Sequence, residues 1–212
     1  GRLGLITCYD INFPEMVRSV AMHGAEVLIH PTGEPYAPHR DQWEMGRRTR
    51  AYENLMYVIS ANHGGWISQI DGEVFADTPG LIFQQRRGGE IAPRDRSHGG
   101  SKIVDFNGHV VGQSQSPGEA LATGTIDIQA LRERRAEMRG NILAQARSEI
   151  YAREYAKHRG NPLNRWLEKP IQKKREGYLN TREVVDRYLA EGVYAPPEGY
   201  EAAAGEPGRK QA

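Results

Sequence analysis

The chain has 212 residues, 38% of them hydrophobic and 26% charged, with a formal net charge of +1. This length and composition suit one globular domain with a sizeable core. The near-neutral charge argues against a general nucleic-acid binder, and no apolar run approaches the roughly 20 residues that span a bilayer.

The first stretch of the chain joins a short apolar run to the chain's single cysteine, Cys8. Leu3–Ile6 predicts a strand covered on both faces, and Pro14 is typical of the first turn of a helix. Cys8 is therefore expected at the carboxyl end of a strand, where open α/β sheets bind ligands. One cysteine excludes an intrachain disulfide, which fits a reducing, cytoplasmic compartment.

Hydrophobic spacing and breaker residues then predict alternating helices and strands. In chain order these are a helix over 14–23 that Gly24 ends, a strand over 26–30 that Pro31 ends, a helix over 42–54, and a strand over 56–61. This alternation predicts a parallel or mixed sheet with right-handed crossovers. The strand ends at Cys8, His30–Glu34 and Asn62–His63 should open on one edge of the sheet.

The helix expected over 42–54 has three predicted features. Asp41 and Glu44 form a D-x-x-E capping box. Its arginines are expected on a solvated face that makes ion pairs; they are Arg47, Arg48 and Arg50. Its buried contacts are expected from Trp43, Ala51, Tyr52 and Leu55.

The second half of the chain contains fewer regular patterns. Residues 66–100 are rich in Gly, Pro and Arg, which is typical of a lid or binding loop, and only 80–84 resembles a strand. Asn107-Gly108 predicts a type I′ hairpin turn. The remaining expectations are a strand over 123–128, one long helix over 129–157 that Gly140 weakens, a last helix capped by Asn180 and ending at Gly192, and a disordered tail over 198–212.

The residues alone leave two interpretations of Cys8. A lone cysteine is more often a small buried hydrophobic residue, but a strand end just ahead of a helix amino terminus favours a reactive thiolate. The adjacent Asp10 carboxylate disfavours that thiolate, so activation requires a nearby base or cation. His30 and His63 are the local bases, and nothing in their spacing selects either. No metal site or cofactor is expected, because the histidines lack the close paired spacing of zinc sites.

Several separated blocks resemble the carbon-nitrogen hydrolases of the nitrilase superfamily. They are CYDINFPEMVRSVAMHGAEVLIHPT, RTRAYENLMYVISANHGG, GGSKIVDFNGHVV and TGTIDI, in family order within about 1–65 and 99–135. The resemblance implies an α/β protein with a nitrilase-like α-β-β-α sandwich. The sequence CYD followed by FPE is more similar to the amidase branches than to the true nitrilases.

The resemblance also implies roles for individual residues. Cys8 matches the nucleophile, which attacks an amide or nitrile carbon to give a thioester or thioimidate that water resolves. Tyr9 matches the position whose backbone N–H helps hold the developing oxyanion. The positions that match substrate-pocket loops are Thr32, Glu34, Tyr36, Asn62 and His63.

The family's mechanism also uses a glutamate base and a lysine, both upstream of the cysteine. Residues 1–7 contain neither. We therefore expect the carboxyl-terminal portion of a longer hydrolase domain, here an incomplete domain over 1–158. Residues 159–212 are expected to form an extension with a helix over about 181–191.

The predicted function is hydrolysis of a non-peptide carbon-nitrogen bond in an amide or N-carbamoyl substrate. The alternative is a catalytically inactive fragment or pseudoenzyme that serves as a structural or interaction module. The expected partners are a small amide, carbamoyl or nitrile molecule and further copies of the chain in a dimer or larger homo-oligomer, with neither nucleic acid nor a membrane among them.

Overall fold

The computed structural model describes residues 1–33, 40–62, 67–70, 73–76, 99–114, 120–157 and 174–197. The chain divides into two units, Gly1–Ala146 and Arg147–Ala212, and each is described by itself. Among the described residues, no helix is both long and apolar enough to cross a membrane.

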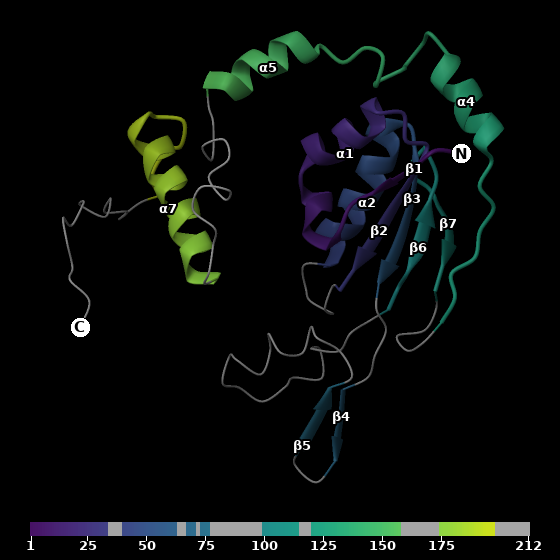
Figure 1. Cartoon of the computed structure of the whole chain (residues 1–212), viewed down its shortest axis with the longest axis horizontal. Coiled ribbons are helices and arrows are strands. Elements are labelled where there is room, and N and C mark those ends of the chain that lie inside the picture. Colours follow the sequence, from purple (N-terminus) through teal and green to yellow (C-terminus); the bar gives the residue numbers. More distant parts are fainter. Residues whose placement is uncertain are drawn as a thin grey trace. The chain divides into compact units, whose positions relative to one another are not determined.

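The first unit contains a sheet and the helices that cover it (Figure 1). Its elements are β1 (Leu3–Leu5), the 3-10 helix η1 (Cys8–Asn12), α1 (Pro14–Met22), β2 (Val27–Thr32), α2 (Arg40–Asn54), β3 (Tyr57–Asn62), β4 (Ile67–Ile70), β5 (Glu73–Ala76), β6 (Lys102–Val104), β7 (Val110–Gln113) and α4 (Ile128–Ala136). Five strands form one sheet in the order β1-β2-β3-β6-β7, and β4 pairs with β5 separately. The predicted α/β class is confirmed.

Strands β1, β2 and β3 are parallel, as the alternation of strands and helices predicted. Their carboxyl ends therefore lie at one edge of the sheet, which places Cys8, His30 and Asn62 along that edge. Strands β6 and β7 then run antiparallel beyond β3. The pair β4 and β5 was not predicted from the sequence, and residues 80–84 lie outside the described part of the chain.

Strand β1 differs from its prediction, because it lies at the edge of the sheet and only one of its faces is covered. Gly4 faces α1, where a Cβ atom would lie 2.2 Å from Cγ1 of Val20. Leu3 and Leu5 point to the opposite face and are 71% and 66% exposed. A strand covered on both faces was therefore the wrong interpretation of the apolar run.

The core has two parts, one on each face of the sheet. On the face covered by α1 and α2 the buried side chains are Ile6, Ile11, Val17, Ala21, Ala25, Leu28, Ala51, Met56, Val58 and Val104. On the other face they are Val27, Leu55, Tyr57, Ile103 and Leu131, the last of these from α4. Packing against helices α1 and α2 thus holds the sheet in place, with the carboxyl ends of its parallel strands along one edge.

Helix α1 ends before Gly24, as predicted, because Gly24 has a φ of 90° that suits glycine. Strand β2 does not stop at Pro31 but runs on to Thr32. The last residue of β2 that pairs with β1 is Ile29, so Pro31 lies where the strand has only β3 beside it. A proline is tolerated at such an edge position.

Helix α2 departs from its prediction at both polar and apolar positions. It begins at Arg40, so Asp41 lies within the helix, and the Glu44 carboxylate binds Arg47 and Lys102 instead of capping. Arg47 is only 2% exposed, which contradicts a solvated arginine face. Tyr52, expected to be buried, is instead exposed.

The hairpin between β6 and β7 forms where it was predicted, but its turn is not type I′. That turn needs a positive φ at both central residues, and of Asn107 and Gly108 only Gly108 has one, 83°. The Gly108 N–H donates to the Asp105 carbonyl (2.9 Å), and the Asp105 carboxylate accepts the N–H groups of Asn107 and His109. The Asp105 side chain therefore stabilises a different turn.

Residues 120–157 contain two separate helices instead of a strand and one long helix. Residues 123–127 are not a strand, and α4 begins at Ile128. After α4 the chain turns at Gly140, whose φ is 67°. The Asn141 amide donates to the Arg135 and Glu137 carbonyls and accepts the Ala144 N–H. These bonds satisfy the end of α4, which explains the break.

The second unit contains α5 (Ser148–Lys157) and α7 (Lys174–Ala190). Helix α7 begins before Asn180, so Asn180 is not its cap. It ends ahead of Gly192, as predicted, where φ is 69°. The expected tail over 198–212 lies outside the described residues.

Glu26, next to β2, makes the strongest ionic contact between α4 and the sheet. Its carboxylate accepts Nε (2.6 Å) and Nη2 (3.2 Å) of Arg132 and the backbone N–H of Arg2 (2.8 Å). The hydrogen bond from Arg132 is the largest cause that lowers the pKa of Glu26 from 4.5 to about 2, and the Arg2 N–H is the next.

This contact predicts a loss of stability in acid. Because the pKa of Glu26 is lower in the folded chain, its stabilisation is complete above pH 4.5 and disappears as the pH falls from about 4.5 to about 2. We expect Glu26→Gln to remove about 1 kcal/mol of this pH-dependent stability, since Arg132 is exposed to solvent. Urea unfolding between pH 5 and 3 measures it, and Glu133→Gln on the exposed side of α4 is the matched control. Equal acid sensitivity of the two variants contradicts the prediction.

Candidate active site

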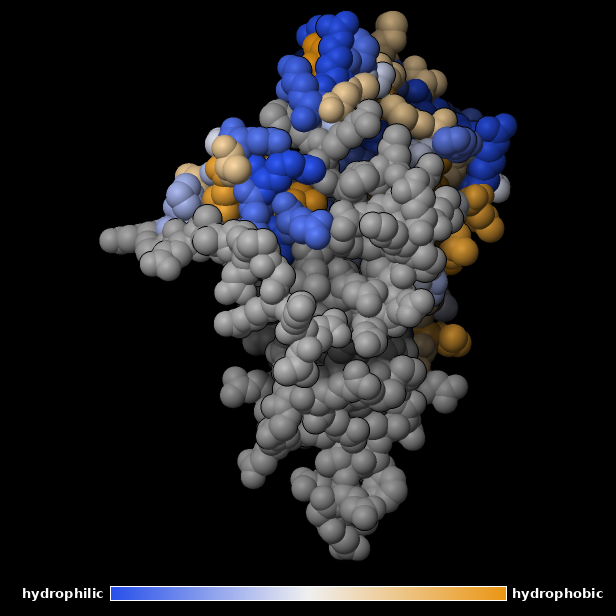
Figure 2. Space-filling model, turned by 60° about the vertical axis from the view of Figure 1, so that its left-hand side comes forward, coloured by the Kyte–Doolittle hydropathy of each residue, from blue (hydrophilic) through white to orange (hydrophobic). Residues whose placement is uncertain are grey.

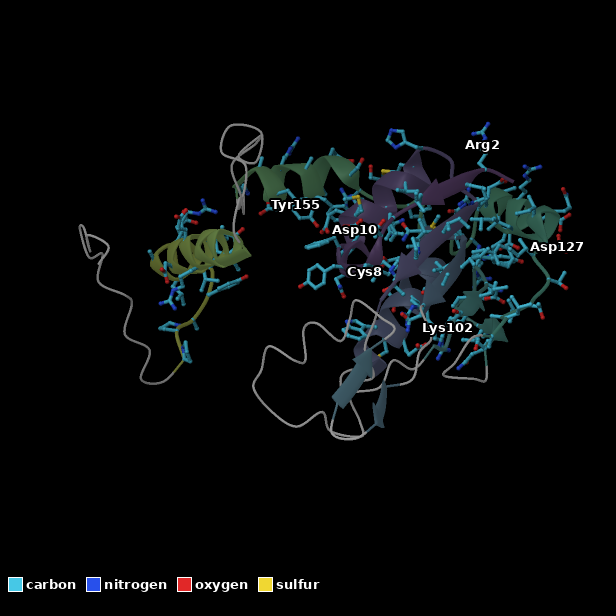
Figure 3. All side chains as sticks on the ribbon, turned by 60° about the horizontal axis from the view of Figure 1, so that its bottom comes forward. Arg2, Cys8, Asp10, Lys102, Asp127 and Tyr155 are labelled. Atoms are coloured by element: carbon cyan, nitrogen blue, oxygen red, sulfur yellow. The ribbon has the colours of Figure 1, made fainter. Side chains whose placement is uncertain are left out.

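Cys8 lies at the carboxyl end of the segment that contains β1, at the first position of η1 (Figure 3). It is half-buried, and its φ of 47° is in the left-handed region that residues other than glycine rarely adopt. The Asp10 carboxylate accepts the Thr7 N–H at 3.0 Å, and the Asp10 N–H donates to the Thr7 carbonyl. Asp10 thus closes the turn around the thiol.

The turn is also held by α2. The Arg50 guanidinium donates from Nε to the Ile11 carbonyl at 3.0 Å and lies 3.5 Å from the Asn12 carbonyl. Within the turn, the Asn12 amide donates to the Tyr9 carbonyl at 2.9 Å. Helix α1 begins at Pro14, as predicted, and the 3-10 helix η1, which was not predicted, lies between Cys8 and α1.

Tyr9, the expected oxyanion position, projects from this turn. Its side chain is 69% exposed and contacts the Phe13 ring edge-to-face, with 5.7 Å between the ring centroids. The ring therefore lies on the outside of the turn.

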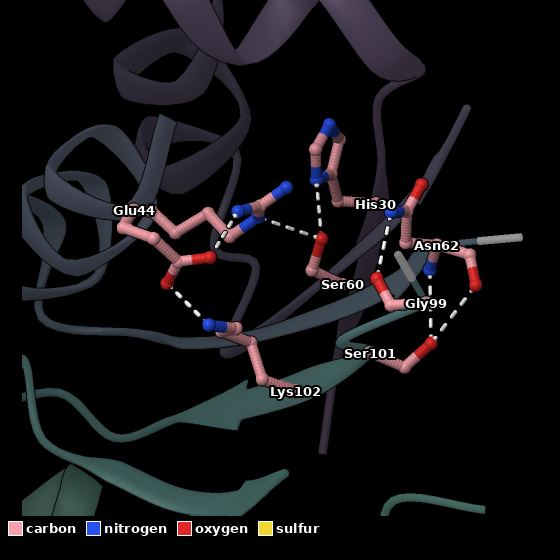
Figure 4. A network of polar contacts seen from close by, with 8 residues as sticks. His30, Glu44, Ser60, Asn62, Gly99, Ser101 and Lys102 are labelled. Atoms are coloured by element: carbon pink, nitrogen blue, oxygen red, sulfur yellow. Dashed lines mark hydrogen bonds and ion pairs between the residues drawn. The ribbon is translucent and has the colours of Figure 1, made fainter. Parts of the chain in front are cut away.

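His30, on β2, contacts the turn over residues 7–12 that contains Cys8, here called the Cys8 turn. Its Nε2 lies 2.9 Å from the Cys8 carbonyl oxygen. Its Nδ1 lies 2.9 Å from Oγ of Ser60 (Figure 4). Both ring nitrogens are therefore engaged, and the ring is fully buried. In this arrangement His30 donates to the backbone of Cys8 and does not serve as a base for its thiol. His63, the other candidate base, lies outside the described residues.

The contact to His30 belongs to a row of polar side chains across the sheet. In the strand register, His30 pairs with Ser60 and Ser60 pairs with Lys102. From α2, Arg47 donates Nε to Oγ of Ser60 and Nη1 to Oε1 of Glu44, each at 2.9 Å. Lys102 pairs with the other oxygen of Glu44. These five side chains form the polar row.

Two of the expected pocket residues are described, at the ends of β2 and β3. Thr32 is the register partner of Asn62, so they lie side by side. The Asn62 amide donates to the Gly99 carbonyl (2.7 Å), and the Asn62 backbone N–H donates to Oγ of Ser101 (3.0 Å). These bonds thus join the chain just before and just after residues 63–98. Glu34, Tyr36 and His63 lie outside the described residues.

The sequence patterns did not indicate that Arg50 contacts the Cys8 turn, or that Ser60 and Lys102 belong to the polar row. A signal was present for Ser60, a polar residue within the apolar run 56–61. No local pattern indicated Arg50 or Lys102, because their partners lie far away in the chain. In the part of the chain that the structure describes, no group of three His, Cys, Asp or Glu side chains is arranged to hold a metal ion.

A family model for carbon-nitrogen hydrolases matches residues 1–136. The chain belongs to the carbon-nitrogen hydrolase family. This membership agrees with the α/β arrangement above, in which Cys8 follows a parallel strand.

Two relatives from this hydrolase family are similar over most of the chain. Human deaminated glutathione amidase is 30% identical over 165 residues, which cover 77% of this chain and 40% of that protein. The 2-oxoglutaramate amidase of Paenarthrobacter nicotinovorans is 30% identical over 149 residues, which cover 70% and 41%. The chain therefore spans about two fifths of the length of these relatives.

Solved structures show the same fold. A carbon-nitrogen hydrolase from Helicobacter pylori G27 is similar with a TM-score of 0.56 and 24% identity, over 73% of this chain and 49% of that chain. The NitFhit protein of C. elegans is similar with a TM-score of 0.53 and 28% identity, over 71% and 30%. The expected nitrilase-like fold is thereby confirmed.

Proposed function

We propose that the protein hydrolyses a non-peptide carbon-nitrogen bond, with Cys8 as the nucleophile. The observation that carries the proposal is the Cys8 turn itself. It presents the family's cysteine at the carboxyl edge of parallel strands, in a left-handed conformation (φ 47°) held from α2 and from β2. Such a turn resembles the exposed nucleophile turns of other α/β hydrolases in its strand-to-helix context.

The chemistry divides hydrolysis into two steps. The Cys8 thiolate attacks the carbonyl carbon of an amide or N-carbamoyl group, and the Tyr9 backbone N–H stabilises the developing oxyanion. The C–N bond breaks, the amine leaves with the proton that the thiol gave up to the glutamate base, and a thioester remains on Cys8. Water then attacks the thioester, which releases the acid and restores the thiol.

We propose that a glutamate base and a lysine complete the site and come from sequence upstream of Gly1. His30 donates to the Cys8 carbonyl, so this side chain does not act as a base for the Cys8 thiol. Two further observations support the proposal. The chain matches only about two fifths of its relatives, and Leu3 and Leu5 expose an apolar face on β1 that a longer domain could cover.

We propose that the substrate pocket lies at the carboxyl edge of the sheet. Thr32 and Asn62 support this, since they lie side by side at the ends of β2 and β3 on the edge that carries Cys8. The other pocket residues in this proposal are Glu34, Tyr36 and His63. Two relatives are named as amidases, so linear amides, with 2-oxoglutaramate among them, are the first substrates to test.

Three wider properties are part of the same proposal. The hydrolase domain extends to about residue 158, and 159–212 is an extension. The protein is cytoplasmic, which its single cysteine supports. It forms a homo-oligomer. Exposed apolar residues in the described part of the chain support this, and Figure 2 shows hydrophobic residues at the surface among hydrophilic ones.

The test compares the chain alone with the chain carrying its upstream sequence. Both are incubated with linear amides and N-carbamoyl compounds, and released ammonia or amine and the intact mass are measured. We expect little turnover from residues 1–212, and turnover with an acyl adduct on Cys8 from the longer protein. Robust hydrolysis by residues 1–212 contradicts the upstream base and lysine. Inactivity of both proteins on all substrates, with no adduct, contradicts the proposed function.

A further inference from the structure

The polar row (Figure 4) lies on the face of the sheet covered by α1 and α2, and its member His30 contacts the Cys8 carbonyl. Three of its members are almost completely removed from solvent: His30 is 0%, Ser60 2% and Arg47 2% exposed. Burying polar groups is unfavourable unless they are hydrogen-bonded, so each of these side chains is held by its partners. The row therefore has one defined hydrogen-bonding arrangement.

The direction of each hydrogen bond follows from the chemistry of the groups. A carbonyl oxygen only accepts, so Nε2 of His30 carries the proton and donates to the Cys8 carbonyl. Nε of Arg47 only donates, so Oγ of Ser60 accepts from it. When His30 is neutral, its Nδ1 only accepts, and the Ser60 hydroxyl then donates to it. Every donor in this series points toward Cys8.

The far end of the row is also fixed. The positive charge of Arg47 is compensated by Glu44, which pairs with Lys102 as well. A buried charge is tolerated when it is paired and hydrogen-bonded, and breaking such a pair is unfavourable. Glu44 and Lys102 thus hold Arg47 in the orientation that serves Ser60.

Cys8 has a backbone conformation that needs such support. Its φ of 47° is strained for a residue with a Cβ atom, and strained conformations persist only where neighbouring contacts hold them. The bond from His30 to the Cys8 carbonyl fixes the peptide group directly after the strained residue. The orientation of that peptide group also sets the direction of the Tyr9 N–H.

We propose that His30, oriented by Ser60 and Arg47, is a positioning residue that holds Cys8 in its left-handed conformation and so aims the thiol and the Tyr9 N–H. This inference rests on the proposed function, in which Cys8 is the nucleophile. His30 does not touch the substrate; it acts through the backbone of Cys8.

The single cysteine gives a direct test of the contact, because protein labelled with [1-¹³C]cysteine has one enriched backbone carbonyl. Loss of a hydrogen bond moves a carbonyl carbon upfield. We expect an upfield shift in His30→Leu, a smaller one in Ser60→Ala, and recovery in His30→Gln, whose amide donates at similar reach. His23→Leu is the matched control, since the His23 ring also bonds a carbonyl, that of Ser19, but in α1; we expect it to leave the signal unchanged.

The positioning role is tested by steady-state kinetics on the active form of the protein. We expect the kcat of His30→Leu to fall about tenfold with KM within about twofold, and His30→Gln to recover most of the loss. An unmoved Cys8 carbonyl signal in folded His30→Leu, or an unchanged kcat, contradicts the inference. If the wild type hydrolyses none of the substrates, the proposed function fails instead, and the carbonyl signal still decides whether His30 holds Cys8.

Discussion

Replacing Cys8 with alanine is expected to reduce amide hydrolysis by the active protein by about 10⁴-fold or more. Removing a nucleophile abolishes the covalent path, and the residual rate then depends on binding and on oxyanion stabilisation alone. The thiol is half-buried at the surface of the turn, so the shorter alanine side chain leaves the packing of the sheet unchanged. The loss is therefore expected in kcat, with little change in thermal stability.

The measurement is initial-rate release of ammonia or amine from the best linear amide, together with intact mass. Cys8→Ser is the companion variant, because it keeps a hydroxyl at the same position but is a weaker nucleophile. Neither variant should form the acyl adduct that the proposed mechanism places on the Cys8 thiol. Full activity of Cys8→Ala in a correctly folded protein would show that Cys8 is structural, which was the alternative left open by the residues alone.

Substituting Gly112 with alanine is expected to destabilise the first unit by about 2–3 kcal/mol. A Cβ atom on Gly112 would lie 2.2 Å from the Thr123 carbonyl oxygen and 2.9 Å from the Thr123 carbonyl carbon. Both are backbone atoms, so no side-chain rotation can relieve the overlap. The segment that follows β7 must therefore move away from the sheet, and with it the approach to α4.

Gly46 provides the matched control for this substitution. It lies within α2, and a Cβ atom there would have no atom within 4 Å. Gly46→Ala is thus expected to stabilise the chain by about 0.5–1 kcal/mol, since alanine favours a helix more than glycine does. Urea unfolding of both variants measures the difference. Similar stabilities for the two would contradict the close approach of residue 123 to β7.

The elements that the sequence predicted correctly are those specified by local patterns. Gly24 and Gly192 end helices because their backbone conformations suit glycine. The alternation of apolar strands with helices gave the parallel order of β1, β2 and β3. The edge that carries Cys8, His30 and Asn62 followed from that order alone.

The errors arose where polar side-chain contacts, or the position of a strand in the sheet, decided the structure and apolar periodicity did not. Arg47 is charged and lies on a helix, which favours a solvated position, yet Ser60 and Glu44 bury it. Asn141 broke the predicted long helix through bonds that no periodicity reveals. Leu5 was expected to be buried because an apolar run does not show which strand lies at the edge of a sheet.

The tie between Asn62, Gly99 and Ser101 has a consequence for the segment between them. These contacts join the chain at the two ends of residues 63–98, beside β3 and β6. Changing the length of a segment with fixed ends costs little, about 0.6 kcal/mol for each doubling. An insertion or deletion within residues 63–98 is therefore expected to leave the sheet and the Cys8 turn as they are.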